Sequence, residues 1–164
     1  MKILGVDPGL RITGYGVISI SKSFHRDRRM HLLEAGIIRS TPSMGIAARL
    51  KKIHDALAEV ISEFRPDVLV IEKMFTHTRH PTTAILMGHV RGVVCLLSGT
   101  ARVPLVSVAS THVKKAVTGR GHASKWQIQR TIQTALGLKE VPEPPDVADA
   151  LAIAVSYAWT LKKR

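Results

Sequence analysis

The sequence predicts an α/β fold in which a mixed β-sheet is flanked by helices. Short apolar runs alternate with segments of helical periodicity, in the order βββ-α-β-α-β-α-α-α. Hydrophobic residues make up 45% of the 164 residues, enough for one substantial core, and the aromatic share of 4% makes that core mainly aliphatic. The length suits a single domain, residues 1–164.

The first three elements are expected to be strands that could form a meander. The ranges are Lys2–Val6, Ile12–Ile20 and about Met30–Ile38. The turn pair Pro8-Gly9 separates the first two, and a basic stretch separates the second from the third.

A helix is expected next, because apolar residues recur at spacings of 3, 4 and 7. These residues are Leu50, Ile53, Leu57, Val60, Ile61 and Phe64. On another face Lys51, Asp55, Glu59 and Glu63 stand four apart, which is typical of a solvated helix surface, so we interpret these acids as structural. Pro66 ends the helix.

The second half of the chain predicts two more strands and four helices. The continuous apolar run "DVLVIE" favours a strand covered on both faces, and "VPLVSV" favours another strand. Pro81 can begin a helix that runs to about Leu97. Three further helices are expected at "THVKKAV", "SKWQIQRTIQTAL" and "PPDVADALAIAVSYAW", the last opened by prolines.

The charge balance indicates a nucleic-acid partner. The formal net charge is +12, from 24 Lys and Arg against 12 Asp and Glu. No basic amphipathic helix, no signal peptide and no run of roughly 18 apolar residues is visible, so no membrane partner is expected. The single Cys95 can form neither an internal disulfide nor a thiolate zinc site, which fits a reducing cytosol.

Four carboxylates stand out by their position. Asp7 follows the first strand, Glu72 closes the run Val68–Ile71, and Asp146 and Asp149 lie three apart on one face of the last helix. Singly, each has an ordinary interpretation: a turn cap, a strand-end acid in solvent, or acids favoured at a helix N-terminus. Together they fit one site better, because two strand ends and a helix face can converge.

Such a cluster calls for cations. Four carboxylates within a few ångströms repel one another and raise each other's pKa. Hard divalent ions, magnesium or manganese, relieve that conflict through oxygen ligands. Two such ions about 4 Å apart could activate water and stabilise the leaving oxygen in phosphodiester cleavage.

Four segments together resemble the RuvC family of Holliday-junction resolvases: "GVDPGLRITGYGVI", "VLVIEKMF", "HVRGV" and "PDVADALAIAV". The likeness runs from Met1 to about Ala158. It implies a ribonuclease H-like fold with a mixed five-stranded sheet flanked by helices. It also implies a homodimeric endonuclease of recombination and repair that makes paired, symmetric nicks in four-way DNA junctions with Mg²⁺, or Mn²⁺ as a substitute, two ions per subunit.

The resemblance also assigns residues. By it, Asp7, Glu72, Asp146 and Asp149 are the catalytic metal ligands, and Lys114 and Lys125 act near the scissile phosphate. Phe75 would stack on junction bases, with Arg79, Lys115 and Arg120 as further DNA contacts. We do not interpret His77 and His80 as zinc ligands. The basic turn Phe24–Met30 departs from the family pattern, and we interpret it as a solvated hairpin.

Partners follow from the same resemblance. Gly88 and Gly92 stand four apart on the second helix, a spacing that lets helices approach closely, and the family uses this helix at its dimer interface. The family works in the bacterial cytoplasm, on nucleoid DNA, with a junction-binding protein and a branch-migration motor.

Three other functions remain open at this point. "DPGLRITGYG" is also similar to the first phosphate loop of actin-like kinases, although such enzymes need two domains around ATP. A nucleic-acid binder without activity would explain the charge and not the four acids. A ribonuclease H-fold nuclease of pre-ribosomal RNA would differ in its substrate.

Overall fold

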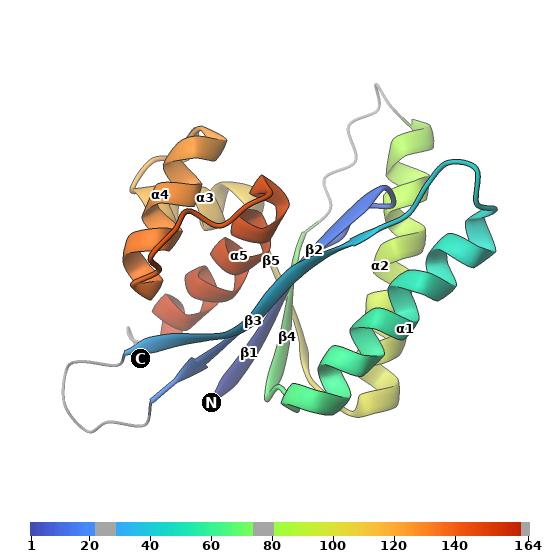
Figure 1. Ribbon diagram of the computed structural model, residues 1–164, viewed down its shortest axis with the longest axis horizontal. Coiled ribbons are helices and arrows are strands. Elements are labelled where there is room, and N and C mark those ends of the chain that lie inside the picture. Colours follow the sequence, from blue (N-terminus) through green and yellow to red (C-terminus); the bar gives the residue numbers. More distant parts are fainter. Residues whose placement is uncertain (22–28, 74–80, 162–164) are drawn as a thin grey trace.

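The computed structural model describes residues 1–21, 29–73 and 81–161, and these form a five-stranded sheet between two helical layers (Figure 1). The strand order is β3-β2-β1-β4-β5. The strands are β1 Lys2–Asp7, β2 Ile12–Ile20, β3 Met30–Arg39, β4 Val68–Glu72 and β5 Leu105–Val108. The first three form an antiparallel meander, whereas β1, β4 and β5 run parallel, so the predicted mixed sheet is confirmed.

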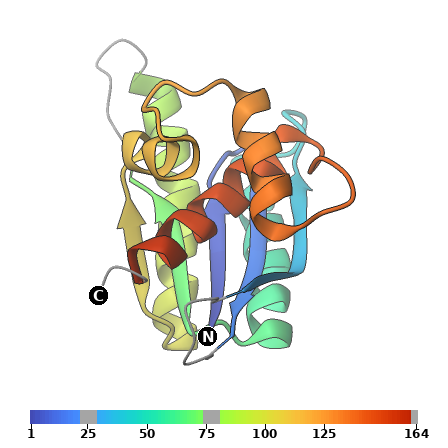
Figure 2. The same ribbon diagram turned by 90° about the vertical axis from the view of Figure 1, so that its left-hand side faces the viewer.

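Helices cover both faces of the sheet. They are α1 Ile46–Phe64, α2 Pro81–Ala101, α3 Ser110–Thr118, α4 Lys125–Leu136 and α5 Pro145–Leu161. In Figure 1, α1 and α2 lie on one side of the sheet, and α3, α4 and α5 lie on the other. Figure 2 shows α5 running obliquely across the sheet.

Local sequence explains where several helices begin and end. Ser124 and Gln127 form a reciprocal capping box at the start of α4. Arg65, Gly119 and Gly137 end α1, α3 and α4 in the left-handed conformation. In α1, Lys51 Nζ lies 2.5 Å from Asp55 Oδ2, as the four-residue spacing predicted.

Element boundaries differ from the predictions by a few residues. Helix α1 begins at Ile46, before the first periodic residue Leu50, and α2 continues past Leu97 to Ala101. Most residues of these extensions are small or exposed, and they carry no apolar repeat. Strand β5 begins at Leu105, two residues later than predicted, because Pro104 has no N–H to donate to a ladder.

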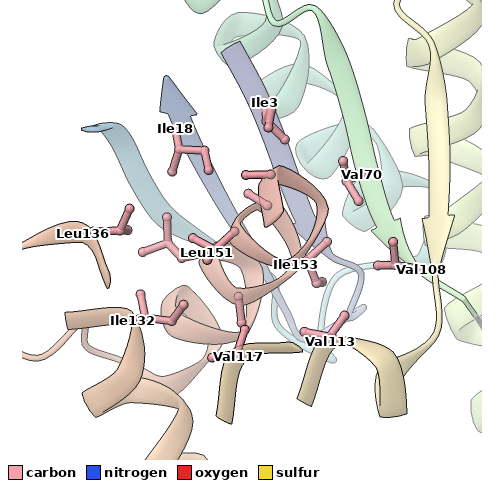
Figure 3. Packing of buried hydrophobic residues seen from close by; sticks show 14 of the residues in the cluster. Ile3, Ile18, Val70, Val108, Val113, Val117, Ile132, Leu136, Leu151 and Ile153 are labelled. Carbon is pink, nitrogen blue, oxygen red and sulfur yellow. The ribbon is translucent and has the colours of Figure 1, made fainter. Parts of the chain in front are cut away.

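Two apolar clusters fill the space on the two faces. On the α5 face, Leu151 and Ile153 lie among Ile3, Ile18 and Val70 of the sheet, with α3 and α4 closing the cluster (Figure 3). On the other face, α1 and α2 pack on the sheet through aliphatic side chains. Strand β4 is buried at Val68–Ile71, which confirms the prediction of a strand covered on both faces.

Helix α5 lies unusually close to β1 and β2, because glycines face it. A Cβ added at Gly5 would stand 2.3 Å from the Ala150 carbonyl oxygen, and one at Gly14 would stand 2.2 Å from the Asp146 carbonyl oxygen. Neither carbonyl belongs to a flexible side chain, so only glycine fits without a shift of the helix. The two glycines thereby set the height of α5 above the sheet.

Helix α2 bears on the expectation that the chain has no segment long and apolar enough to span a membrane. Its segment Thr82–Ala101 is long and apolar enough to cross a membrane by length and composition, and only 22% of the apolar window is buried. The inner side nevertheless belongs to the core, since Val90, Val94 and Leu97 are buried against the sheet. Ile85 and Leu96 are each 62% exposed on the outer side.

Candidate active site

Asp7 and Glu72 stand next to each other at one edge of the sheet. Each is the last residue of its strand, and β1 and β4 are parallel neighbours with Val6 opposite Ile71. Parallel strands end at the same edge, so the two carboxylates lie side by side. Both line a pocket of about 160 Å³, together with Asp149.

The glycine contacts of α5 bring the other two acids to this edge. Asp7 pairs with Gly14 across the β1–β2 ladder, and the Asp146 backbone lies directly over Gly14. Asp149 follows one helical turn later and faces the pocket. Asp7, Glu72 and Asp149 therefore line one pocket, whereas Asp146 does not line it and acts on it through its charge, which contributes to raising the pKa of Asp7.

Asp7 carries the strongest electrostatic signature. Burial, followed by the charges of Asp149, Glu72 and Asp146, raises the pKa of Asp7 to about 7, against a smaller opposing effect of Lys125. Burial also raises the pKa of Asp149, whereas the nearby Lys125 lowers it. The site thus holds more negative charge than its surroundings neutralise, which is the condition that a divalent cation would relieve.

The donor set fits a hard divalent metal. All four side chains offer carboxylate oxygens, the ligands that magnesium and manganese prefer. In the described part of the chain, no three His, Cys, Asp or Glu side chains already stand close enough to enclose an ion. The like charges of the carboxylates repel one another, which acts against a closer approach of their oxygens. The fit of this site to a divalent metal therefore rests on the donor chemistry and on the raised pKa of Asp7.

Two lysines flank the acids. Lys125 Nζ lies 3.7 Å from Asp149 Oδ2, and Lys114 lines the same pocket from α3. Val113 and Val117 anchor α3 in the core, which presents Lys114 to the pocket. Lys115 and Arg120 are exposed and do not line it. Some of the residues considered in the sequence lie outside the part of the chain that the structure describes. They are Phe75, His77, Arg79 and His80, and all but the last two residues of the basic turn Phe24–Met30.

Arg91 lies in the segment "HVRGV" quoted above, but sequence reasoning assigned it no role at the site. Its guanidinium donates to the Glu72 carbonyl oxygen at 2.9 Å and to Ser107 Oγ at 2.7 Å. The side chain therefore ties α2 to the ends of β4 and β5. An arginine inside an otherwise apolar helix was the available signal, since such a charge needs partners.

Comparison with known proteins agrees with the family resemblance found in the sequence. The family model described as "Crossover junction endodeoxyribonuclease RuvC" matches residues 3–157. A protein of that name from Rhodopirellula baltica is 48% identical over 93% of this chain and 83% of its own length. One from Pseudothermotoga lettingae is 44% identical over 94% of this chain and 91% of its own length.

Solved structures agree in fold. The Thermus thermophilus RuvC in complex with Holliday junction substrate has a TM-score of 0.89 and 32% identity, covering 99% of this chain and 96% of that one. The yeast mitochondrial Holliday junction resolvase has a TM-score of 0.67 at 14% identity, covering 98% of this chain and 79% of that one, and supports the fold alone. The chain belongs to the RuvC family of crossover junction endodeoxyribonucleases, with its ribonuclease H-like fold.

Proposed function

We propose that this protein is a structure-selective endonuclease that resolves four-way Holliday junctions by paired symmetric nicks, in homologous recombination and DNA repair. The observation that carries the proposal is the convergence of Asp7, Glu72 and Asp149 in one pocket flanked by two lysines, with Asp146 on the adjacent turn of α5. The net charge of +12 suits a DNA partner. Residues 1–164 act as a single ribonuclease H-like nuclease domain.

The metal of this reaction is Mg²⁺, with Mn²⁺ as a substitute and two ions per subunit during catalysis. Asp7, Glu72, Asp146 and Asp149 would hold the ions. Bound there, the metal would supply an activated water and stabilise the leaving oxygen. The role of Asp7 is favoured by its raised pKa, because a buried carboxylate among like charges gains most from a cation.

The lysines position the phosphate. Lys114 and Lys125 line the acid pocket, so each can contact a non-bridging oxygen of the scissile phosphate and offset its growing charge. Lys125 would exchange its contact with Asp149 for one with DNA. Lys115, Arg120 and Arg79 would hold neighbouring phosphates, and Phe75 would stack on a base at the branch point.

The working form is a homodimer that uses the outer side of α2. Ile85 and Leu96 are exposed there, and a Cβ added at Gly92 would meet nothing within 4 Å. A second copy could bury these groups, and its two-fold symmetry would present two equivalent sites to the two equivalent strands of a junction. The dimer would act in the bacterial cytoplasm, on nucleoid DNA, with a junction-binding protein and a branch-migration motor.

The other functions fit less well. An actin-like kinase needs two domains around ATP, whereas the described residues form one five-stranded sheet between two helical layers, which disfavours a kinase. A binder without activity would gain nothing from an acid whose pKa is raised by burial and by three other carboxylates.

The direct test is incubation with a synthetic mobile four-way junction and magnesium. We expect paired nicks at symmetric positions, and none in a linear duplex of the same sequence or with a chelator. A pre-ribosomal RNA fragment serves as the competing substrate. Cleavage of that RNA with no cleavage of the junction would overturn the proposal in favour of an RNA-processing nuclease.

A further inference from the structure

A second depression lies on the opposite side of Asp146 from the acid pocket. It measures about 770 Å³ and lies between the β1–β2 turn, the end of β3, α1 and the start of α2. We call it the arginine groove, after Arg11, Arg39 and Arg49, which line it with Thr41, Thr83 and Asp146. The family assignment and the sequence reasoning gave none of these arginines a role.

The groove is positively charged. Among the described residues that line it, Asp146 is the only acid, against three arginines. Arg11 and Arg39 are exposed, and no ion pair joins either of them to an acid within the described ranges. A concave surface with one sign of charge concentrates an oppositely charged partner.

Arg49 adds a fixed charge at the base of the groove. This half-buried guanidinium donates through Nε to Ser40 Oγ at 2.9 Å and through a terminal nitrogen to the Leu10 carbonyl oxygen at 3.2 Å. Both acceptors are neutral, so its positive charge is not cancelled by the groups that hold it. An anion in the groove would supply the missing counter-charge.

The same bonds hold the rim in place. Ser40 Oγ also donates to the Leu10 carbonyl oxygen, and the Ser40 N–H donates to the Arg11 carbonyl oxygen at 3.0 Å. Thr13 Oγ1 donates to the Gly9 carbonyl oxygen at 2.7 Å. The β1–β2 turn is therefore fixed against the end of β3, which presents Arg11 and Arg39 on neighbouring backbone segments.

The position of the groove indicates its ligand. The acids lie between two groups of basic side chains, with Lys114 and Lys125 on the α3–α4 side and the arginines on the α1–α2 side. A nucleic-acid strand that places one phosphate at the acids must continue in both directions. The strand's next phosphates then need cations on each side, and the lysines serve only one side.

We propose that the arginine groove binds backbone phosphates of the cleaved DNA strand next to the scissile phosphate, and that Arg11 and Arg39 are positioning residues. This inference rests on the proposed junction-cleaving function. The contacts would fix the register of the strand and carry no base information, because arginine meets the sugar–phosphate backbone there.

The test compares two double variants with equal charge loss. The groove variant is Arg11→Gln with Arg39→Gln. The control is Arg65→Gln with Arg102→Gln, two exposed arginines before β4 and β5, at the sheet end away from the acids. Junction binding is measured with a chelator between 50 and 200 mM salt, so no cleavage is needed. Melting curves confirm that both variants fold.

We expect the slope of log affinity against log salt to fall by about 1.8 in the groove variant, from about 0.9 per lost phosphate contact. Wild-type affinity then drops about 12-fold more than that of the groove variant across this salt range. The control should keep the wild-type slope. Methylphosphonates placed singly near the cleavage point should weaken wild-type binding at two neighbouring positions and leave the groove variant unaffected there.

An unchanged slope in the groove variant, or methylphosphonate effects that persist in it at full size, would overturn the inference. A wild type that binds the junction and never nicks it with magnesium would contradict the proposed function, while the binding data would still decide on the groove. A wild type that does not bind the junction at all would contradict both.

Discussion

Helices α5 and α2 are both apolar and lie on opposite faces of one sheet, yet they are used in opposite ways (Figure 1). Helix α5 is buried almost throughout its middle, whereas α2 leaves Ile85 and Leu96 62% exposed. Apolar composition alone therefore does not distinguish a helix that completes a core from one that leaves large apolar side chains exposed.

The two helices differ in where the small residues next to them lie. On the α5 side the glycines belong to the strands, and Gly5 and Gly14 admit the helix backbone. On the α2 side Gly92 belongs to the helix itself and faces open space. The first arrangement places Asp146 and Asp149 near Asp7, and the second leaves the exposed surface that we propose as the dimer interface.

The largest expected effect concerns charge on the α5 side. Asp7→Asn should stabilise the metal-free protein by on the order of 3 kcal/mol at pH 8 and by little at pH 4. Its folded pKa of about 7 lies above the ordinary 3.8, so the folded state binds more protons between these values. The contribution of Asp7 to the free energy of unfolding is therefore fully present below pH 3.8 and is lost as the pH rises through 7. Chemical denaturation at both pH values measures the gain.

A control for this prediction is Asp55→Asn, since the pKa of Asp55 is lowered by hydrogen bonds from Lys51 and His54. That exposed group should give no gain at pH 8. Equal gains in both variants would mean that general charge reduction, and not the acid cluster, explains the result.

The second effect concerns the close approach of α5. Gly14→Ala should cost about 2–3 kcal/mol of unfolding free energy, because its Cβ would stand 2.2 Å from the Asp146 carbonyl oxygen. The displaced helix should also misplace Asp146 and slow nicking in the folded fraction. Urea unfolding and single-turnover nicking at low temperature measure the two consequences, and a protein of wild-type stability would contradict the packing argument.

The third effect concerns the outer side of α2. Ile85→Ser with Leu96→Ser should weaken dimerisation by about 2 kcal/mol, roughly 30-fold in Kd, and leave monomer stability nearly unchanged. Trp126→Ser is the matched control, because Trp126 is 59% exposed and lies on α4. Sedimentation equilibrium measures the Kd of the dimer. A double variant that dimerises as strongly as the wild type would place the interface elsewhere.

The smallest expected effect is a gain in unfolding free energy, opposite in sign to the loss expected for Gly14→Ala. Gly92→Ala should stabilise the monomer by about 0.5–1 kcal/mol, because alanine favours a helix interior and its Cβ meets nothing within 4 Å. The same methyl group should hold two copies of α2 apart and weaken the dimer. Destabilisation of the isolated monomer would break the comparison between the two helices.

Much of the site was predictable from short-range sequence pattern. Asp7 and Glu72 end apolar runs, and the ends of parallel neighbours meet, so their adjacency followed once the strands were identified. Asp146 and Asp149 share a helix face by spacing alone. The family resemblance, confirmed by comparison, then related these acids to a known arrangement.

What sequence could not supply depends on contacts between distant elements. Gly14 belongs to the segment "DPGLRITGYG", which is similar to a phosphate loop, yet it faces the backbone of α5. The arginine groove joins Arg11, Arg39 and Arg49 from three elements, and only the tertiary fold brings them together. The exposure of α2 was equally hidden, because an apolar helix is expected to be buried.

The proposed function requires that the strand ends and α5 form one metal-dependent site for junction cleavage. Its most direct test is single-turnover nicking of a mobile four-way junction in magnesium by the wild type, Asp7→Asn, Asp149→Asn and the double variant. We predict that each single change lowers the rate at least about 1,000-fold and that the double change costs little more, because the acids act as a unit. Near-wild-type nicking by either single variant, or losses that simply multiply, would contradict a single metal-dependent site built from these acids.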